Sequence, residues 1–142
     1  MPSITFTHHN VPNPLKDKLS AKTFLESVFA QEKTRFKSIR YIFCNDEYLL
    51  KLNKEYLNHD TLTDILTFTL SGLSLPIVSE IYISIERVSE NAEMQKVDFL
   101  NELYRVMIHG ILHLCGYEDH TSEQKEEMRN REDFYLRDSD LF

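Results

Sequence analysis

The stretch HGILHLCGYEDH contains three histidines, and two of them, His109 and His113, stand four residues apart. Side chains at this spacing lie on the same face of a helix, so both imidazoles can bind one metal ion. A catalytic zinc takes three protein ligands and keeps a fourth position for water. The third ligand has to come from beyond the helix, and Gly116 lets the chain turn back without a Cβ clash. The spacing predicts a metal site built on a helix and the turn after it.

Two residues beyond this turn, Asp119 and His120, are candidates for the third ligand. In the pattern His-x3-His-x2-Gly-x2-ligand, the ligand position falls on Asp119, and His120 follows it directly. A carboxylate oxygen and an imidazole nitrogen bind zinc at similar distances. The spacing favours Asp119 and the ligand type favours His120, so both alternatives stay open.

The residue after the first histidine bears on the kind of chemistry. Zinc peptidases of the His-Glu-x-x-His type place their general base at this position. Here the position is Gly110, which has no side chain to accept a proton. A peptidase would need its base from elsewhere. Cys115 follows His113 by two residues and points off the shared helix face, so we expect a small core residue rather than a ligand.

The elements that position these residues follow from periodicity and from helix-capping signals. Asn13 is a candidate cap with Pro14 at the first helical position, and Thr121 and Gln124 are spaced as a capping box. Strands are predicted over 3–8, 38–45, 65–70 and 80–85, and helices over 13–32, 45–52, from 86 to about 95, 97–116 and 121–136. We expect an α+β fold, a single domain over 1–142 with a small mixed sheet, about five helices, and the metal site at the end of a central helix.

The composition is that of a soluble globular chain: 142 residues, 42% hydrophobic and 27% charged. No apolar run approaches the roughly 18 residues that a membrane span needs. The N-terminal stretch lacks the basic start and apolar middle of a signal peptide, so we expect a cytoplasmic protein. Cys44 and Cys115 are too few for a disulfide framework.

The net charge of −7 argues against a general nucleic-acid binder, but the charge is uneven. Between Lys16 and Arg40 there are seven basic residues against three acids. From Glu118 to the end there are nine acids against four bases. Both segments can simply be solvated helix faces. The alternative is a basic surface for an anionic partner, with the acidic tail turned away from it.

Two segments of the chain resemble the YbeY family of metal-dependent endoribonucleases. HGILHLCGYEDH is similar to the family signature HGxLHLxGYDH, and LNKEYLNHDTLTDILTF (Leu52–Phe68) is similar to the family segment LNxxYRxxDxxTDVLSF. SEIYIS matches a GDIxIS-like strand, and the helix before His109 has the family rhythm EL…R…HG. The resemblance extends from about Ile39 to Met128.

The resemblance implies an α+β fold and one Zn²⁺ ion held by three histidines of the signature. His109 and His113 match directly. This chain reads GYEDH where the family reads GYDH, so either Glu118 is an insertion and His120 is the ligand, or Asp119 replaces the family histidine.

Three other positions in the resemblance bear on the mechanism. Leu57 stands where the family has an arginine, which would suit a phosphate contact; a neighbour such as His59 would have to meet that role. Glu80 replaces the aspartate of the family's GD pair. Asp64, in the matching TD, is a candidate catalytic residue, either as a proton acceptor near the metal or as a partner that orients a metal ligand, or else a turn residue that bonds to backbone.

The function that the resemblance implies is single-strand-specific, metal-dependent endoribonuclease activity in ribosomal RNA processing. It would include late-stage maturation of the 16S rRNA 3′ end and ribosome quality control, with ribosomal RNA and the ribosomal subunit as partners. One alternative is a zinc metallopeptidase-like hydrolase. A second alternative is a non-catalytic ribosome-binding factor with a structural metal. The basic stretch Lys16–Arg40 is the candidate for contact with the RNA backbone.

Overall fold

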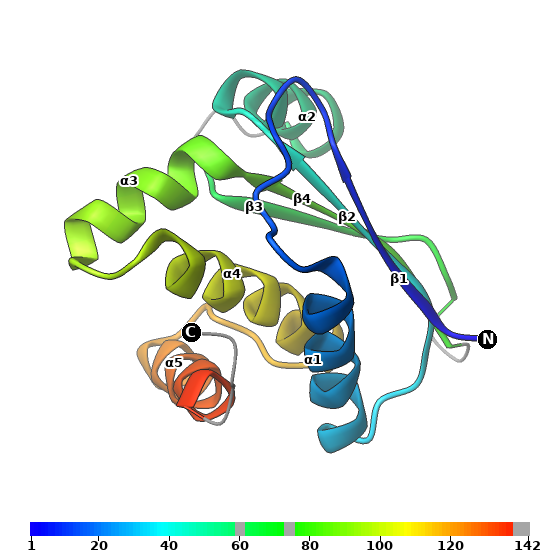
Figure 1. Ribbon diagram of the computed structural model, residues 1–142. Helices are drawn as coiled ribbons and strands as arrows, with labels where there is room; N and C mark the ends of the chain where they lie inside the picture. Colours follow the sequence, from blue (N-terminus) through cyan, green and yellow to red (C-terminus); the bar gives the residue numbers. More distant parts are fainter. Residues whose placement is uncertain (59–61, 73–75, 138–142) are drawn as a thin grey trace.

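A four-stranded mixed sheet forms the frame of the protein (Figure 1). The computed structural model describes residues 1–58, 62–72 and 76–137. Strands β1 (Ser3–His8), β2 (Phe36–Cys44) and β4 (Ile77–Ser84) are parallel neighbours, and β3 (Ile65–Thr69) pairs antiparallel with β4 at the edge, in the order β1-β2-β4-β3. With the helices below, the sheet confirms the predicted α+β class.

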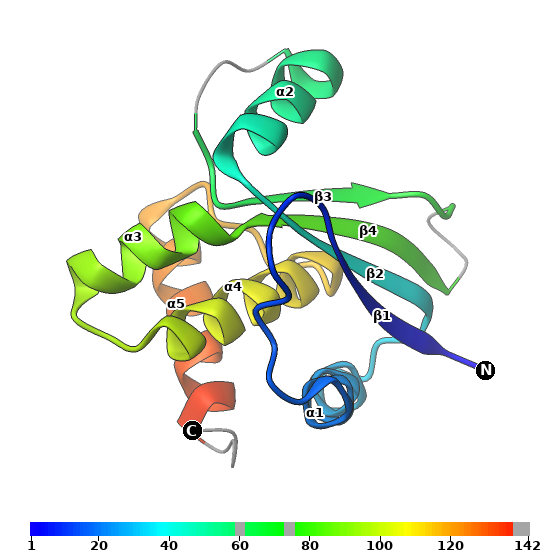
Figure 2. The same ribbon diagram turned by 45° about the horizontal axis from the view of Figure 1, so that its top comes forward.

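The helices lie on both faces of this sheet. They are α1 (Lys18–Gln31), α2 (Asp46–Leu57), α3 (Ile85–Gln95), α4 (Phe99–Leu114) and α5 (Ser122–Arg137). Helices α1 and α4 cover one face, α5 packs on the far side of α4, and α2 lies on the opposite face of the sheet (Figure 2). Helix α4 is therefore the central helix, because it contacts the sheet, α1, α3 and α5. No helix in the described ranges is long and apolar enough to cross a membrane.

The main core lies between the sheet and α4. Alternate residues of the central strands turn toward the helix and are fully buried, among them Tyr41 and Ile81. Met107 of α4 is also fully buried, and its carbonyl accepts a hydrogen bond of 2.9 Å from the Tyr41 hydroxyl. That bond satisfies a buried polar group, as a buried tyrosine requires. Helix and sheet are thus joined by apolar packing and by one buried hydrogen bond.

The first helix begins later than its sequence predicts. Asn13 does not cap a helix: its Oδ1 accepts from the Leu15 amide at 3.2 Å in a local turn. Asp17 is the true N-cap, because its carboxylate accepts from both the amide and the hydroxyl of Ser20. The prediction of a helix start at Asn13 and Pro14 is therefore wrong.

Other element boundaries also shift. Helix α2 continues to Leu57 instead of ending near residue 52, and Asn58 closes it in the left-handed conformation. Strand β4 begins at Ile77, three residues before the predicted start, because it pairs with β2 along its whole length. The capping box before α5 is as predicted: Gln124 N donates to Thr121 Oγ1 at 3.1 Å, and Thr121 N donates to Gln124 Oε1 at 3.0 Å.

Helix α4 approaches the sheet closely at Gly110. A Cβ atom at this position would lie 3.1 Å from Ile65 Cδ1 and 3.2 Å from Ile81 Cδ1.

We expect Gly110→Val to lower the free energy of unfolding by about 1–3 kcal/mol, because two further methyl groups overpack this contact. Urea unfolding measures the change. Ala30→Val, at an exposed helical position, is the control and should cost less than about 0.7 kcal/mol; equal effects of the two variants would contradict a tight contact at Gly110.

Candidate metal centre

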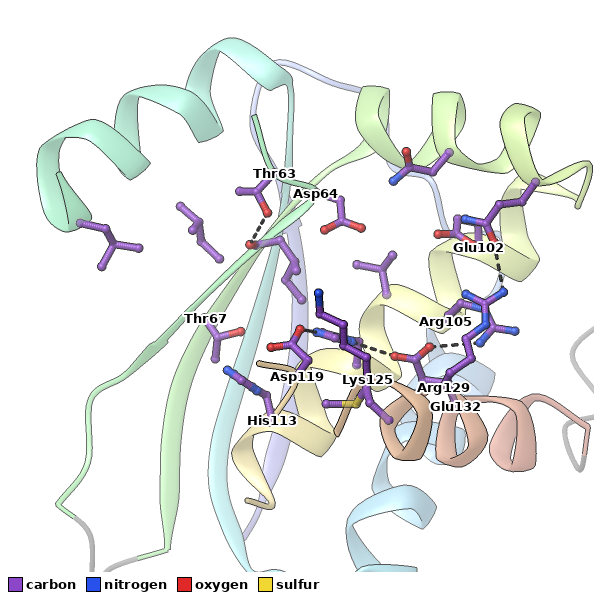
Figure 3. Close-up of a pocket in the computed structure, with 18 residues that line it drawn as sticks. Thr63, Asp64, Thr67, Glu102, Arg105, His113, Asp119, Lys125, Arg129 and Glu132 are labelled. Atoms are coloured by element: carbon purple, nitrogen blue, oxygen red, sulfur yellow. Dashed lines mark hydrogen bonds and ion pairs between the residues drawn. The ribbon is translucent and has the colours of Figure 1, made fainter. Parts of the chain in front are cut away.

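Helix α4 places His109 and His113 on one face, beside a pocket of about 600 Å³. Their rings are nearly parallel, with centroids 6.1 Å apart. The pocket lies between strand β3 and helices α3, α4 and α5, and Figure 3 shows its polar side chains gathered around the face of α4. The predicted pair therefore does share a face, and that face turns to a cavity rather than to the core.

His109 is held by an acid from another helix. Its Nδ1 lies 2.7 Å from Glu132 Oε2 of α5, and Glu132 is only 4% exposed. Arg105, one turn before His109, donates to the other oxygen of Glu132 at 3.1 Å and to Asp133 at 2.6 Å. A carboxylate that accepts from Nδ1–H leaves Nε2 as the free nitrogen of the neutral ring. This is the arrangement in which proteins orient metal-binding histidines.

The surroundings of His109 favour positive charge. Burial lowers the pKa of this imidazole, but the hydrogen bond and charge of Glu132, with the charges of Asp119 and Asp64, outweigh burial and raise the pKa. The same carboxylates would stabilise a bound cation. His109 therefore sits where a metal ion is electrostatically favourable.

His113 is oriented by the turn that follows α4. Its Nδ1 lies 2.9 Å from the carbonyl oxygen of Tyr117. Because a carbonyl only accepts, Nδ1 carries the proton and Nε2 is free in the neutral ring. Gly116 makes this turn possible with φ of +106°, a conformation that side chains disfavour. The glycine of the motif therefore serves to orient His113 as well as to return the chain.

The two candidates for the third ligand, Asp119 and His120, differ in their position relative to the pocket. Asp119 lines the pocket, and its Oδ2 is 3.5 Å from His109 Nε2. His120 is exposed and is not among the residues that line this pocket, and its backbone amide donates to Gln124 Oε1 at 3.0 Å at the start of α5. In the parts of the chain that the structure describes, no three histidine, cysteine or acidic side chains are already grouped closely enough to hold an ion. The structure thus brings Asp119, and not His120, beside the histidine pair.

Asp64 reaches the same pocket from the start of β3 (Figure 3). Burial raises the pKa of its carboxyl, with the charge of His109 acting in the opposite direction. Its own carbonyl accepts from Ser84 N at 3.0 Å, so the backbone role of a strand-end residue is met as well. Glu102 of α4 also lines the pocket, and burial raises the pKa of its carboxyl, whose Oε1 has no hydrogen-bond partner among the described residues. Both acids are suited to holding a proton.

The remaining sequence candidates are divided between the pocket and other places. Leu57 lines the pocket at the end of α2. Glu80 does not: it lies on β4, where it accepts from Arg40 and from the Tyr82 hydroxyl, both at 3.2 Å. Cys115 packs against the main core, as expected. His59, the suggested substitute for the family arginine, lies outside the described residues.

The sequence predictions gave no role to Arg105 and Glu132, the two residues that hold His109. Arg105 precedes His109 by four residues on the same helix, so helical periodicity alone could have placed it beside the first histidine. Glu132 lies twenty-three residues after His109 in another helix. Only the packing of α5 on α4 brings its carboxylate to the imidazole.

Glu32 supports the turn between α4 and α5 through hydrogen bonds. Glu32, at the C-terminus of α1, accepts hydrogen bonds from the hydroxyls of Tyr117 and Tyr135 and from the guanidinium of Arg131. Tyr117 therefore has two roles, since its hydroxyl bonds to Glu32 while its carbonyl bonds to His113. This network joins α1 and α5 to the turn that leads to Asp119.

The fold and the pocket define an α+β protein with a His-x3-His helix beside a pocket rich in acids and bases. The family described as Endoribonuclease YbeY matches residues 6–140, and the chain belongs to this family. The resemblance drawn from the two motifs is therefore confirmed.

Individual relatives agree. The chain is 50% identical over 113 residues to an Endoribonuclease YbeY of Amoebophilus asiaticus, covering 80% of this chain and 77% of the relative. It is 42% identical over 134 residues to that of Cytophaga hutchinsonii, covering 94% of each chain. The solution structure of TM1509 from Thermotoga maritima is similar with a TM-score of 0.65 and 28% identity, over 94% of this chain and 87% of that one.

The Glu32 network predicts a specific response to acid. Burial raises the pKa of Glu32, but the hydrogen bonds from Tyr135, Arg131 and Tyr117 outweigh burial, so the folded pKa lies below the ordinary 4.5. A lowered folded pKa contributes stability above pH 4.5, and this contribution is lost as the pH falls through the folded pKa. Glu32→Gln should therefore destabilise the protein near neutral pH and lose less stability than the wild type on acidification.

Urea unfolding at neutral pH and at about pH 3 measures this difference. Glu55→Gln, on the exposed side of α2, is the matched control and should follow the wild type at both pH values. Parallel stability curves for Glu32→Gln and the wild type would show that the network is not stabilised by an ionised Glu32.

Proposed function

We propose that this chain is a zinc-dependent endoribonuclease that cuts single-stranded RNA during ribosomal RNA maturation, with residues 1–142 as one endoribonuclease domain. The observation that carries the proposal is the His109 and His113 pair, each with Nδ1 hydrogen-bonded so that Nε2 carries no proton in the neutral ring, beside a pocket that Asp119 also lines. Membership of the Endoribonuclease YbeY family supports the substrate class. Ribosomal RNA and the ribosomal subunit are the proposed partners, and the cytoplasm is the proposed location.

The donor set fits zinc. Two imidazole nitrogens and a carboxylate oxygen or third imidazole are zinc ligands, and three protein ligands leave one position open for catalysis. His109 and His113 would supply the two nitrogens. We propose Asp119 as the third ligand, because it lines the pocket 3.5 Å from His109 whereas His120 is exposed beside it. A bound zinc ion supplies Lewis-acid chemistry to phosphodiester cleavage.

The side chains around the pair have distinct tasks in this proposal. Glu132 fixes the ring of His109, and Arg105 fixes Glu132. Asp64, whose pKa burial raises, accepts or holds a proton near the scissile phosphate. Lys125 and Arg129 of α5 line the pocket and can neutralise the phosphoryl oxygens, a task that Leu57 cannot perform in place of the family arginine.

The residue at position 110 does not support the alternative of a zinc metallopeptidase-like hydrolase. A Cβ atom at this position would lie 3.1 Å from Ile65 Cδ1 and 3.2 Å from Ile81 Cδ1, so the packing of α4 on the sheet disfavours a glutamate there. The general base of a His-Glu-x-x-His peptidase therefore has no place in this geometry. The alternative of a structural metal in a ribosome-binding factor predicts RNA binding without cleavage, and the activity experiment below distinguishes it.

Metal content identifies the third ligand. We expect Asp119→Ala to lower the zinc content and to weaken zinc affinity by at least about 100-fold, because it removes one of three ligands, whereas His120→Ala should bind like the wild type. Competition with a chromogenic chelator measures the affinities. Glu132→Gln should weaken zinc binding by about tenfold, since it acts only through the orientation of His109. A loss of zinc in His120→Ala with retention in Asp119→Ala would reverse the assignment.

Cleavage of RNA tests the activity itself. Purified zinc-loaded protein should cut a single-stranded ribosomal RNA fragment, and His113→Ala should reduce the rate by at least about 100-fold, because it removes a metal ligand. His120→Ala is the matched control and should retain wild-type activity within about threefold. Gel analysis of end-labelled RNA measures the rates. Intact RNA with the zinc-loaded wild type would refute the proposed function, and bound but uncut RNA would favour the structural-metal alternative.

A further inference from the structure

A second groove continues from the pocket at His113. It has a volume of about 590 Å³ and lies along the edge strand β3 and the turn between α1 and β2. His113 and Thr67 line both the pocket and this groove. A chain-like substrate bound at the histidine pair can therefore continue directly into the groove.

The two cavities differ in charge. The pocket is lined by four acids and three bases apart from its histidines, and the charges of three of these acids, Glu132, Asp119 and Asp64, act on His109. The described residues that line the groove include two bases, Lys33 and Arg35, and no acid. Several hydroxyl groups join them, from Thr34, Thr67, Thr69 and Ser71. The groove therefore offers cations and hydroxyl groups without a neighbouring acid among the described residues, which suits the phosphate oxygens of a polyanion that continues from the pocket.

The turn that bears the two bases has a defined backbone. Lys33 N donates to Ala30 O and Thr34 N donates to Phe29 O, both at 3.0 Å, which is the Schellman ending of helix α1. Arg35 O accepts from Ile77 N at 3.3 Å, which ties the turn to β4. The two bases are thus presented from a turn fixed by hydrogen bonds on both sides.

Lys33 occupies a position where glycine is usual. Its φ is +55°, the left-handed conformation, which costs a side-chain-bearing residue about 1 kcal/mol relative to glycine. Among the described residues, neither Lys33 nor Arg35 forms an ion pair with an acid. Ion pairs among the described residues therefore do not account for a lysine at this turn. A ligand bound to its ammonium group would account for it.

We propose that Lys33 and Arg35 form a phosphate subsite that holds the RNA backbone next to the scissile bond. The proposal rests on the proposed endoribonuclease function and adds the path of the substrate: from the pocket, past His113 and Thr67, into the groove. It assigns contact with the RNA backbone to two of the seven bases between Lys16 and Arg40. Arg40, by contrast, is paired with Glu80.

The discriminating variant is Lys33→Gly, because it separates stability from binding. Glycine relieves the left-handed conformation, so the variant should unfold at a higher urea concentration, while the lost cation should raise KM for a ten-nucleotide single-stranded RNA about fivefold with kcat unchanged. Lys96→Gly is the matched control, because Lys96 closes α3 with φ of +59° and lines neither cavity. It should be stabilised in the same way and should keep the wild-type KM.

The salt dependence gives a second readout. Each phosphate contact on a single strand contributes about 0.7 to the slope of log affinity against log salt, so Lys33→Gly/Arg35→Ala should lower the slope by about 1.4. Fluorescence anisotropy with zinc-loaded protein measures it, using a ten-nucleotide single-stranded DNA that carries the same phosphates but no 2′-hydroxyl. Unchanged KM and slope in the double variant, with RNA cut normally, would overturn the subsite and leave the function standing. An equal effect of Lys96→Gly would also overturn it.

The two proposals fail in different ways. If the wild type leaves RNA intact but binds the DNA with a slope that drops in the double variant, the groove is a phosphate subsite and the proposed nuclease function is wrong. If the wild type binds neither nucleic acid, both proposals are refuted.

Discussion

The whole site depends on how closely helix α4 packs on the sheet. At Gly110 the helix lies so near to Ile65 and Ile81 that a Cβ atom would already be tight. This contact fixes the rotation of the helix about its axis: the face with Gly110 and Met107 is buried, and His109 and His113 are turned toward the pocket. A helix that packs with one face on a sheet necessarily presents its other positions to what lies beside it. The absence of a side chain at position 110 is thus a packing requirement, and it also removes the general base that a peptidase would use.

The histidine pair is then oriented from two different directions. Glu132, on α5, holds His109, while the carbonyl of Tyr117, in the turn between α4 and α5, holds His113. The turn itself is supported by Glu32 from α1. Each imidazole is therefore held at Nδ1, one by a carboxylate from another helix and the other by the turn that follows α4. Such support lowers the number of ring orientations, which is what a metal site needs from its surroundings.

The distribution of charge gives the two cavities different properties. Carboxylates gather around His109, where they favour a cation, and the two bases of the α1–β2 turn line a groove that has no acid among its described residues. The net charge of −7 does not reveal this separation, because it sums the acids of the pocket and the bases of the groove, which lie on different sides of His113. A nucleic-acid enzyme with an acidic composition is physically reasonable when the acids hold the metal and a local basic groove holds the backbone.

The sequence alone determined the local features of this protein. Helical spacing was sufficient to place His109 and His113 on one face, and the capping box at Thr121 and the turn at Gly116 were predictable because they involve neighbouring residues. The local signal was misleading at the start of α1, where Asn13 forms a turn with Leu15 and the carboxylate of Asp17 caps the helix instead.

Only the tertiary structure decided the rest. It brought Glu132 to His109 across two helices, directed Asp119 rather than His120 into the pocket, and placed Glu80 away from the site. It also joined Lys33 and Arg35 to β3 in one groove. The reason is that each of these arrangements depends on the packing angle between elements, which arises from side chains far apart in the chain and leaves no periodicity in the sequence.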